Sequence, residues 1–157
     1  MLFRSLLGTL PAPGALERLA RAGLISPTGG GAWRFAHPLI RDAAYSGMLA
    51  SRRRLLHARM ADHLESQTAV AVRLGQIATP RAAAGDAVRA LPLLREAAVY
   101  AMGMGAAAEA AAFWHQAAEL SAPGDPVAAA EDRARADEAM AAASALREAA
   151  AAEPSQA

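Results

Sequence analysis

A carboxylate–histidine group in the first half of the chain has the residue types that acid–base catalysis uses. Asp62 and Glu65 share a predicted helical turn with His63, and a carboxylate beside an imidazole can pass protons to and from a substrate. The same carboxylates also fit a plainer interpretation, as solvated charges that offset Arg54, Arg59 and each other along the helix. Because no nucleophile in a strained turn accompanies them, the sequence favours the plainer interpretation and predicts no catalytic residue.

Metal, cofactor and thiol chemistry find little support in the sequence. The chain has no Cys, which excludes disulfides, Cys-ligated zinc and thiol nucleophiles. His57 and His63 are separated so that a helix places them about 240° apart around its axis, on different faces. The glycine cluster over 29–31 lacks the Lys and the Ser or Thr that complete a phosphate loop. We therefore predict no metal ion and no cofactor.

The most suggestive feature is a basic stretch over residues 34–59, in which the only acid is Asp42. Such arginines can bind nucleic-acid phosphates or face another protein. The triplet over 52–54 has no interleaved aromatic residues that would stack on bases, so the protein-facing role is favoured. The predicted interaction residues are Arg41, Arg52, Arg53, Arg54, Arg59 and, on a later helix, Trp114.

Trp114 and its neighbour Phe113 lie on an amphipathic helix in the second half of the chain. Adjacent residues of a helix point in different directions, so both cannot face fully inward. We expect Phe113 to be a core residue between paired helices. A core position is favoured for Trp114 as well, although less strongly than for Phe113, and a contact between Trp114 and a partner stays open.

Composition predicts a helical chain with a thin core. Hydrophobic residues make up 54% of the 157 residues, but Ala supplies much of that share and only 4% are aromatic. Ala favours helices yet buries little apolar area. The net charge is +7 over residues 1–100 and −6 over 101–157, so the two parts can attract each other or face different partners. No apolar run is long enough to cross a bilayer or to direct export, and we expect a cytoplasmic protein.

Residues 13–35 predict a helix followed by a β-hairpin. Apolar residues recur at helical spacing from about residue 13, and Gly23 follows as the C-terminal turn. Leu24–Ile25 and Trp33–Phe35 predict two short strands, joined by a glycine-rich turn over 27–31. This order of helix, strand, turn and strand is typical of a winged helix and its wing.

Helices are expected over most of the remaining chain. His37 is the predicted cap of a helix with Pro at its first position, and Ser51 is the predicted cap of the next. Residues 70–78 continue weakly helical. Alanine-rich helices follow Asp86, with a kink or restart predicted at a proline inside the first of them. A last helix begins after Asp125, and we expect it to be solvated on most sides because it has almost no large apolar residue.

Two motifs in the first half resemble a known family. An aromatic–Arg–Phe strand leads into a His-Pro-Leu-Ile-Arg-Asp-Ala-Ala-Tyr helix over 33–45, and an Arg-rich helix with a Leu-His pattern follows over 51–65. Both resemble the segment after the nucleotide-binding core of bacterial STAND-type signalling ATPases, which include large ATP-binding LuxR-type regulators and ATPase-coupled adenylate or guanylate cyclases. Residues 105–120 are similar to the second half of a tetratricopeptide unit.

This resemblance implies a mainly α, non-catalytic regulatory or protein-interaction segment. It implies a partial winged-helix domain over 1–67, tetratricopeptide-like helices over 68–122, and a solvated C-terminal helix and tail over 123–157. The ATPase core and any cyclase or DNA-binding output domain would lie outside the chain, which is then expected to be a fragment of a longer regulator. The expected partner is a protein, either the ATPase module or another signalling protein.

Two alternatives stay open. The chain can instead be a free-standing DNA-binding winged helix that uses the arginines over 52–54. It can also be a free-standing helical adaptor in which the wing is accidental.

Overall fold

The computed structural model describes residues 12–29, 32–66 and 74–152. It is mainly helical, with a short β-hairpin near the start followed by helical segments, and this confirms the predicted fold class. In chain order the elements are α2 (Ala15–Arg21), β1 (Ile25–Gly29), β2 (Ala32–Phe35), α3 (Pro38–Ser46), α4 (Ala50–Glu65), α5 (Leu74–Ala84), α6 (Ala87–Gly103), α7 (Ala107–Ser121) and α8 (Pro126–Ala152).

The hairpin pairs β1 with β2 in antiparallel register. Ile25 lies opposite Phe35, and Pro27 lies opposite Trp33. Strand β1 runs on to Gly29, further than the two-residue strand that the sequence predicts, because the residues expected to form a loose turn pair with β2 instead. The pairing is irregular between Pro27 and Gly29, where Gly29 takes a φ of +91° that side chains disfavour.

Three helices begin at their predicted capping residues, and a fourth does not. The side chains of His37, Asp86 and Asp125 each accept a hydrogen bond from a backbone N–H in the first turn of α3, α6 and α8. The prediction that Ser51 caps α4 is wrong. The cap residue is Leu49, whose ψ of 143° is extended, so helical geometry starts before Ser51 and places it inside the first turn.

Two helices continue through a proline. Helix α6 runs through Pro92 without the restart that the sequence predicts, and α5 runs through Pro80, whose side chain is buried. A proline removes a single backbone donor from the helical ladder, so tertiary packing on both sides can hold the helix together. Part of the weak helix predicted over 70–78 lies outside the described residues.

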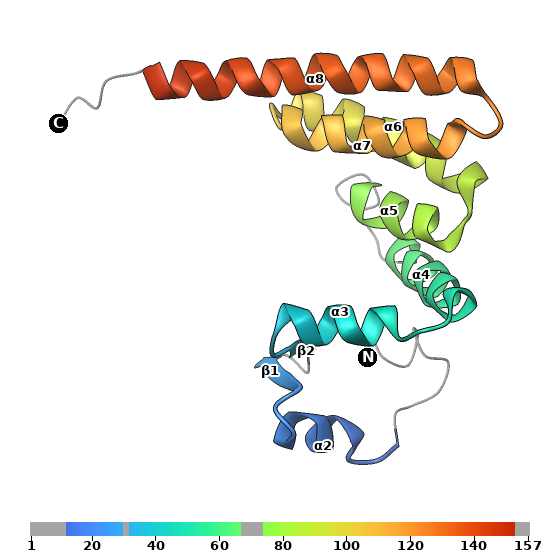
Figure 1. Ribbon diagram of the computed structural model, residues 1–157, viewed down its shortest axis with the longest axis vertical. Coiled ribbons are helices and arrows are strands. Elements are labelled where there is room, and N and C mark those ends of the chain that lie inside the picture. The colour runs from blue at the N-terminus through green and yellow to red at the C-terminus, as the bar shows by residue number, and fades with distance from the viewer. Residues whose placement is uncertain (1–11, 30–31, 67–73, 153–157) are drawn as a thin grey trace.

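Helices α4 to α8 form a stack in which each helix packs on the next one in the sequence (Figure 1). Ile77 and Leu94 are fully buried large side chains, but alanine supplies most of the core. Short alanine side chains allow helix axes to approach closely. The buried alanines are Ala61, Ala78, Ala90, Ala97, Ala98, Ala101, Ala107, Ala110, Ala111, Ala117, Ala118, Ala129, Ala136, Ala139 and Ala143.

Helix α8 lies along α7 and extends beyond its end (Figure 1). The prediction of a helix solvated on most sides is confirmed, because most of its described residues are exposed. One narrow face is buried at helical spacing, and along it lie Ala129, Asp132, Ala136, Ala139 and Ala143. The sequence does not identify this face, because a stripe of alanines differs little in hydrophobicity from the residues around it.

The segment over residues 12–49, here called the N-terminal unit, is packed very differently from the stack. Helix α2 contacts β1, and α3 contacts β2. Among the described residues of the unit no side chain is buried. Leu39 is 71% exposed and Leu49 is 77% exposed. Over residues 12–29 and 32–49 the N-terminal unit therefore has secondary structure with half-buried side chains but no fully buried core residue.

Candidate interaction sites

Tyr45, at the end of α3, connects the N-terminal unit to the stack. Its hydroxyl oxygen lies 2.9 Å from Nε2 of His57. The guanidinium of Arg53 lies 5.3 Å from the Tyr45 ring centroid and donates a hydrogen bond to the Tyr45 carbonyl oxygen at 3.2 Å. Burial lowers the pKa of His57, which favours a neutral ring, and the tautomer without a proton on Nε2 accepts a hydrogen bond from the Tyr45 hydroxyl. We call these three residues the Tyr45 junction.

The carboxylates that suggest acid–base chemistry bind a buried arginine. Arg81 of α5 is 3% exposed, and its guanidinium donates to both carboxylate oxygens of Glu65 at 2.9 and 2.7 Å and to Asp62 at 2.6 Å. Arg89 of α6 donates to Glu65 at 2.7 Å. This cluster of four residues, the Arg81 cluster, joins α4, α5 and α6. The sequence names arginines of the same helix as partners, whereas these two belong to the following helices.

Pairing in the Arg81 cluster changes the protonation of its members. The hydrogen bond from Arg81 lowers the pKa of Glu65, and the same contact raises the pKa of Arg81. A general acid or base at neutral pH needs a carboxyl pKa that is raised instead. The cluster thus has the properties of a structural ion pair.

A second ion-pair cluster joins α6, α7 and α8. Asp132 of α8 is completely buried, and Arg95 of α6 donates to its carboxylate at 3.2 and 2.8 Å. Arg135 lies 3.5 Å from the same carboxylate, and its guanidinium lies 5.0 Å from the ring centroid of Trp114 on α7. The helical spacing of Asp132 and Arg135 is visible in the sequence, but the contacts with Arg95 and Trp114 form only when the helices pack.

The structure packs both neighbouring aromatic residues inside the stack, to different extents. Trp114 is only 7% exposed and packs with Ala98 and Ala136 between three helices, which leaves little of its surface for a partner. Phe113 is half-buried, packs against the core of the stack and faces α5. Both are therefore packing residues, but Trp114 is the more deeply buried of the two, whereas the sequence favours Phe113. Helix α8 covers the Trp114 side of α7, and its packing could not be read from the local sequence.

The predicted interaction arginines occupy different environments. Arg41 is 62% exposed and pairs with the adjacent aspartate at 2.8 Å. Arg53 belongs to the Tyr45 junction. Arg52 and Arg54 are exposed, and Arg59 is half-buried. Arg41 belongs to α3 and the other four arginines belong to α4.

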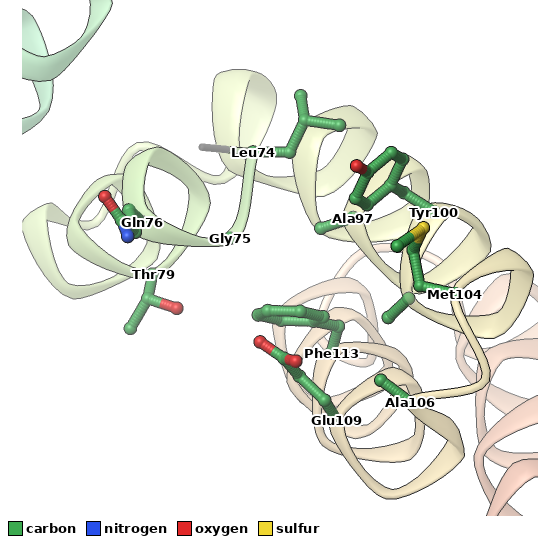
Figure 2. Close-up of a pocket in the computed structure, with 11 residues that line it drawn as sticks. Leu74, Gly75, Gln76, Thr79, Ala97, Tyr100, Met104, Ala106, Glu109 and Phe113 are labelled. Carbon is green, nitrogen blue, oxygen red and sulfur yellow. The ribbon is translucent and has the colours of Figure 1, made fainter. Parts of the chain in front are cut away.

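A pocket of about 560 Å³ opens between α5, α6 and α7 (Figure 2). Tyr100 and Met104 enter it from α6, Phe113 and Glu109 from α7, and Thr79 from α5. The wall is mostly apolar and aromatic, with a few polar groups. This composition is typical of small-ligand and side-chain pockets.

Gly75 shapes the same pocket. A Cβ atom at position 75 would collide with the Phe113 ring, so the absence of a side chain allows the ring to reach α5. Thr79 Oγ1 and Gln116 Oε1, which are 3.4 Å apart, add a polar contact between α5 and α7. The sequence offered no signal for Gly75, because nothing in its local context marks a close approach between helices.

Over residues 12–29, 32–66 and 74–152 no group of three or more His, Cys, Asp or Glu is placed to hold a metal ion. No helix there is long and apolar enough to cross a membrane.

Comparisons with protein-family models, with curated proteins and with solved structures find no match to this chain. The resemblance of residues 33–65 to the STAND-type ATPases thus stays a prediction.

Proposed function

We propose that this chain is a non-catalytic regulatory segment of a STAND-type signalling ATPase, and that its N-terminal unit packs against the nucleotide-binding module. The parent protein would be a transcriptional regulator or an adenylate or guanylate cyclase. In this proposal the ATPase and output activities belong to other modules of the parent protein. This chain connects those modules.

The observation that carries the proposal is that no described side chain of the N-terminal unit is fully buried, although some, such as Ile25, Trp33 and Ile40, are half-buried. A helix and hairpin that bury so little apolar surface have little to offset the conformational entropy of folding. Leu39, Phe35 and Leu49 are all more than one-third exposed in this unit, and such apolar residues mark contact surfaces when they lie together. A neighbouring module that covers this side would supply the missing core.

The Tyr45 junction supports the same proposal. It connects the N-terminal unit to α4 through a hydrogen bond and a cation–π contact instead of an apolar core. A polar junction of this size can hold the N-terminal unit and α4 in a fixed orientation. It can still allow the N-terminal unit to shift when the neighbouring module moves. In this proposal the Arg-rich start of α4 binds protein.

The DNA-binding alternative has weaker support from the geometry. Arg41 pairs with Asp42, and Arg53 donates to the Tyr45 carbonyl oxygen, so two of the predicted arginines are engaged within the chain. Specific duplex binding usually requires several phosphate contacts made together. A gel shift with duplex DNA at low salt tests this alternative directly, and retarded DNA would favour it over the proposal.

The first test is the genomic DNA before the codon for Met1. The proposal expects a stop-free frame that encodes a phosphate loop ending in Gly-Lys-Ser or Gly-Lys-Thr. A promoter and a ribosome-binding site immediately before Met1, with no such loop, would reject the parentage. ATP turnover by the purified chain would reject the non-catalytic role.

The second test measures binding of this chain to the upstream-encoded ATPase module by isothermal titration calorimetry. Leu39→Glu places a charge on the exposed side of the N-terminal unit and should weaken binding at least tenfold. Val88→Glu is the matched control, since Val88 is 85% exposed on α6 in the stack. Equal binding by both variants and the unchanged chain would contradict the proposed surface.

A further inference from the structure

The pocket between α5, α6 and α7 has a distinctive charge. Among the described residues that line it, Glu109 is the one with a charged side chain. Glu109 is exposed and forms no ion pair with another described residue. In Figure 2 its carboxylate lies beside the Phe113 ring at the mouth of the space that α5 borders.

The other pocket walls can contact both the apolar part of a ligand and a cationic group. Phe113 and Tyr100 present aromatic rings, and Met104 adds a polarisable thioether. Gly75 leaves room for Phe113 to project between the helices, so its ring reaches the pocket. An aromatic wall with a carboxylate at its edge attracts ammonium and guanidinium groups and disfavours carboxylates.

From this juxtaposition we propose that the pocket binds a primary ammonium group attached to an apolar chain, with Glu109 pairing the cation and Phe113, Tyr100 and Met104 contacting the chain. A lysine side chain of a protein and a free alkylamine share this chemistry. The site lies within the helical stack, so the proposal does not depend on packing of the N-terminal unit.

Glu109 also lies in the first turn of α7, where the helix dipole favours a carboxylate. That role concerns the stability of α7 and predicts no ligand selectivity. Binding measurements that vary only the charge of the ligand head group therefore separate the two roles.

The experiment titrates the full chain with hexylammonium, 1-hexanol and hexanoate, followed by NMR chemical shifts. These probes share one alkyl chain and differ in charge. We expect hexylammonium to bind about five- to tenfold more tightly than 1-hexanol, with hexanoate weakest. The largest shifts should occur at Gly75, Tyr100 and Met104.

Glu109→Gln should reduce the preference for hexylammonium over 1-hexanol to less than about twofold, while 1-hexanol binding stays unchanged. Glu119→Gln is the matched control, because Glu119 is an exposed acid of the same helix that pairs with His115 outside the pocket. Circular dichroism verifies that both variants keep their helices. Glu109→Lys should reverse the order and favour hexanoate.

Three results would overturn the proposal. One is equal affinity of the unchanged chain for the three probes, which would show an apolar surface without charge selectivity. Another is a hexylammonium preference that survives Glu109→Gln. The third is a set of chemical-shift changes that occur only at residues of the N-terminal unit. To distinguish the two sources of the ammonium group, a lysine-containing peptide and its acetyl-lysine counterpart are compared with the free amine.

Discussion

The N-terminal unit and the helical stack place the same residue type in opposite environments. Leu94 in α6 is completely buried, whereas Leu39 in α3 is 71% exposed. Both are leucines within regular helices, so secondary structure does not account for the difference. The stack contains neighbouring helices that cover each other, while the described neighbours of α3 are the hairpin and the few α4 residues of the Tyr45 junction. Local propensity forms a helix in both regions, and among the described residues the stack supplies much more to pack against.

The two regions also use polar residues differently. In the stack, arginines that are distant in sequence pair with carboxylates that are partly or fully buried, as in Arg81 with Glu65 and Arg95 with Asp132. In the N-terminal unit, the ion pair between Arg41 and Asp42 joins adjacent exposed residues. Exposed pairs contribute little to stability, whereas breaking a buried one is costly. Thermodynamic stability should therefore be concentrated in α4 to α8.

The largest expected effect comes from a leucine in the stack. Leu94→Ala should lower the free energy of unfolding by about 3 kcal/mol, because it leaves a cavity in a core of mostly small residues. Leu39→Ala, its counterpart in the N-terminal unit, should change it by no more than about 0.5 kcal/mol. Urea denaturation followed by circular dichroism measures both. A similar loss for Leu39→Ala would show that the N-terminal unit has a core after all.

Removing the buried arginine should have the next largest effect. Arg81→Ala should cost about 2 kcal/mol, since it breaks three charge-assisted hydrogen bonds and leaves two carboxylates side by side. Arg89→Ala is the matched control, because Arg89 is 53% exposed and makes one of the contacts to Glu65. Its cost should stay below about 1 kcal/mol in the same denaturation experiment. Equal losses of unfolding free energy for the two variants would show that the burial of Arg81 does not increase its contribution to stability.

The Arg81 cluster should also make stability depend on pH. Because folding lowers the pKa of Glu65 from 4.5, its contribution is complete above that value and is lost as the pH falls through the lowered pKa. The unchanged chain should thus lose more stability than Arg81→Ala when the pH drops below 4.5. Urea midpoints at pH 7, 5, 4 and 3 for the two proteins test this difference. Parallel curves would exclude a contribution from Glu65.

The smallest effect concerns the Tyr45 junction between the two regions. Tyr45→Phe removes the hydroxyl that contacts His57 and should cost less than about 1 kcal/mol. Urea denaturation followed by circular dichroism measures this cost. A loss as large as that of Arg81→Ala would show that the hydroxyl contributes more than a single exposed hydrogen bond.

Local sequence signals predicted the helices and their ends well. Gly23, His37, Asp86 and Asp125 mark helix boundaries through backbone conformation or side-chain capping, which depend on a few neighbouring residues. Ser51 failed as a cap because the extended backbone at position 49 starts the helix earlier. This error moves the start of the helix by two residues and leaves the predicted helix itself unchanged.

The candidate sites were much less predictable. Arg81 stands in an alanine-rich segment that gives no indication of Glu65 or Asp62 as partners, and Asp132 resembles any charge on a solvated helix. Gly75 and Phe113 meet only because α5 packs against α7. Each of these contacts joins residues far apart in the chain, so no window of local sequence contains both members.

By itself, the sequence determined a mainly helical chain, a hairpin near its start and the absence of cysteine chemistry, because propensity, capping and composition act over short distances. The tertiary structure alone decided which alanine faces are buried, which aromatic residue is core and which charges pair. An alanine stripe carries too little hydrophobic contrast to identify its neighbour, so the outcome depends on how whole helices stack. For this protein the same stacking creates the pocket beside Glu109, while the described side chains of the N-terminal unit lie outside the stack and are exposed or half-buried.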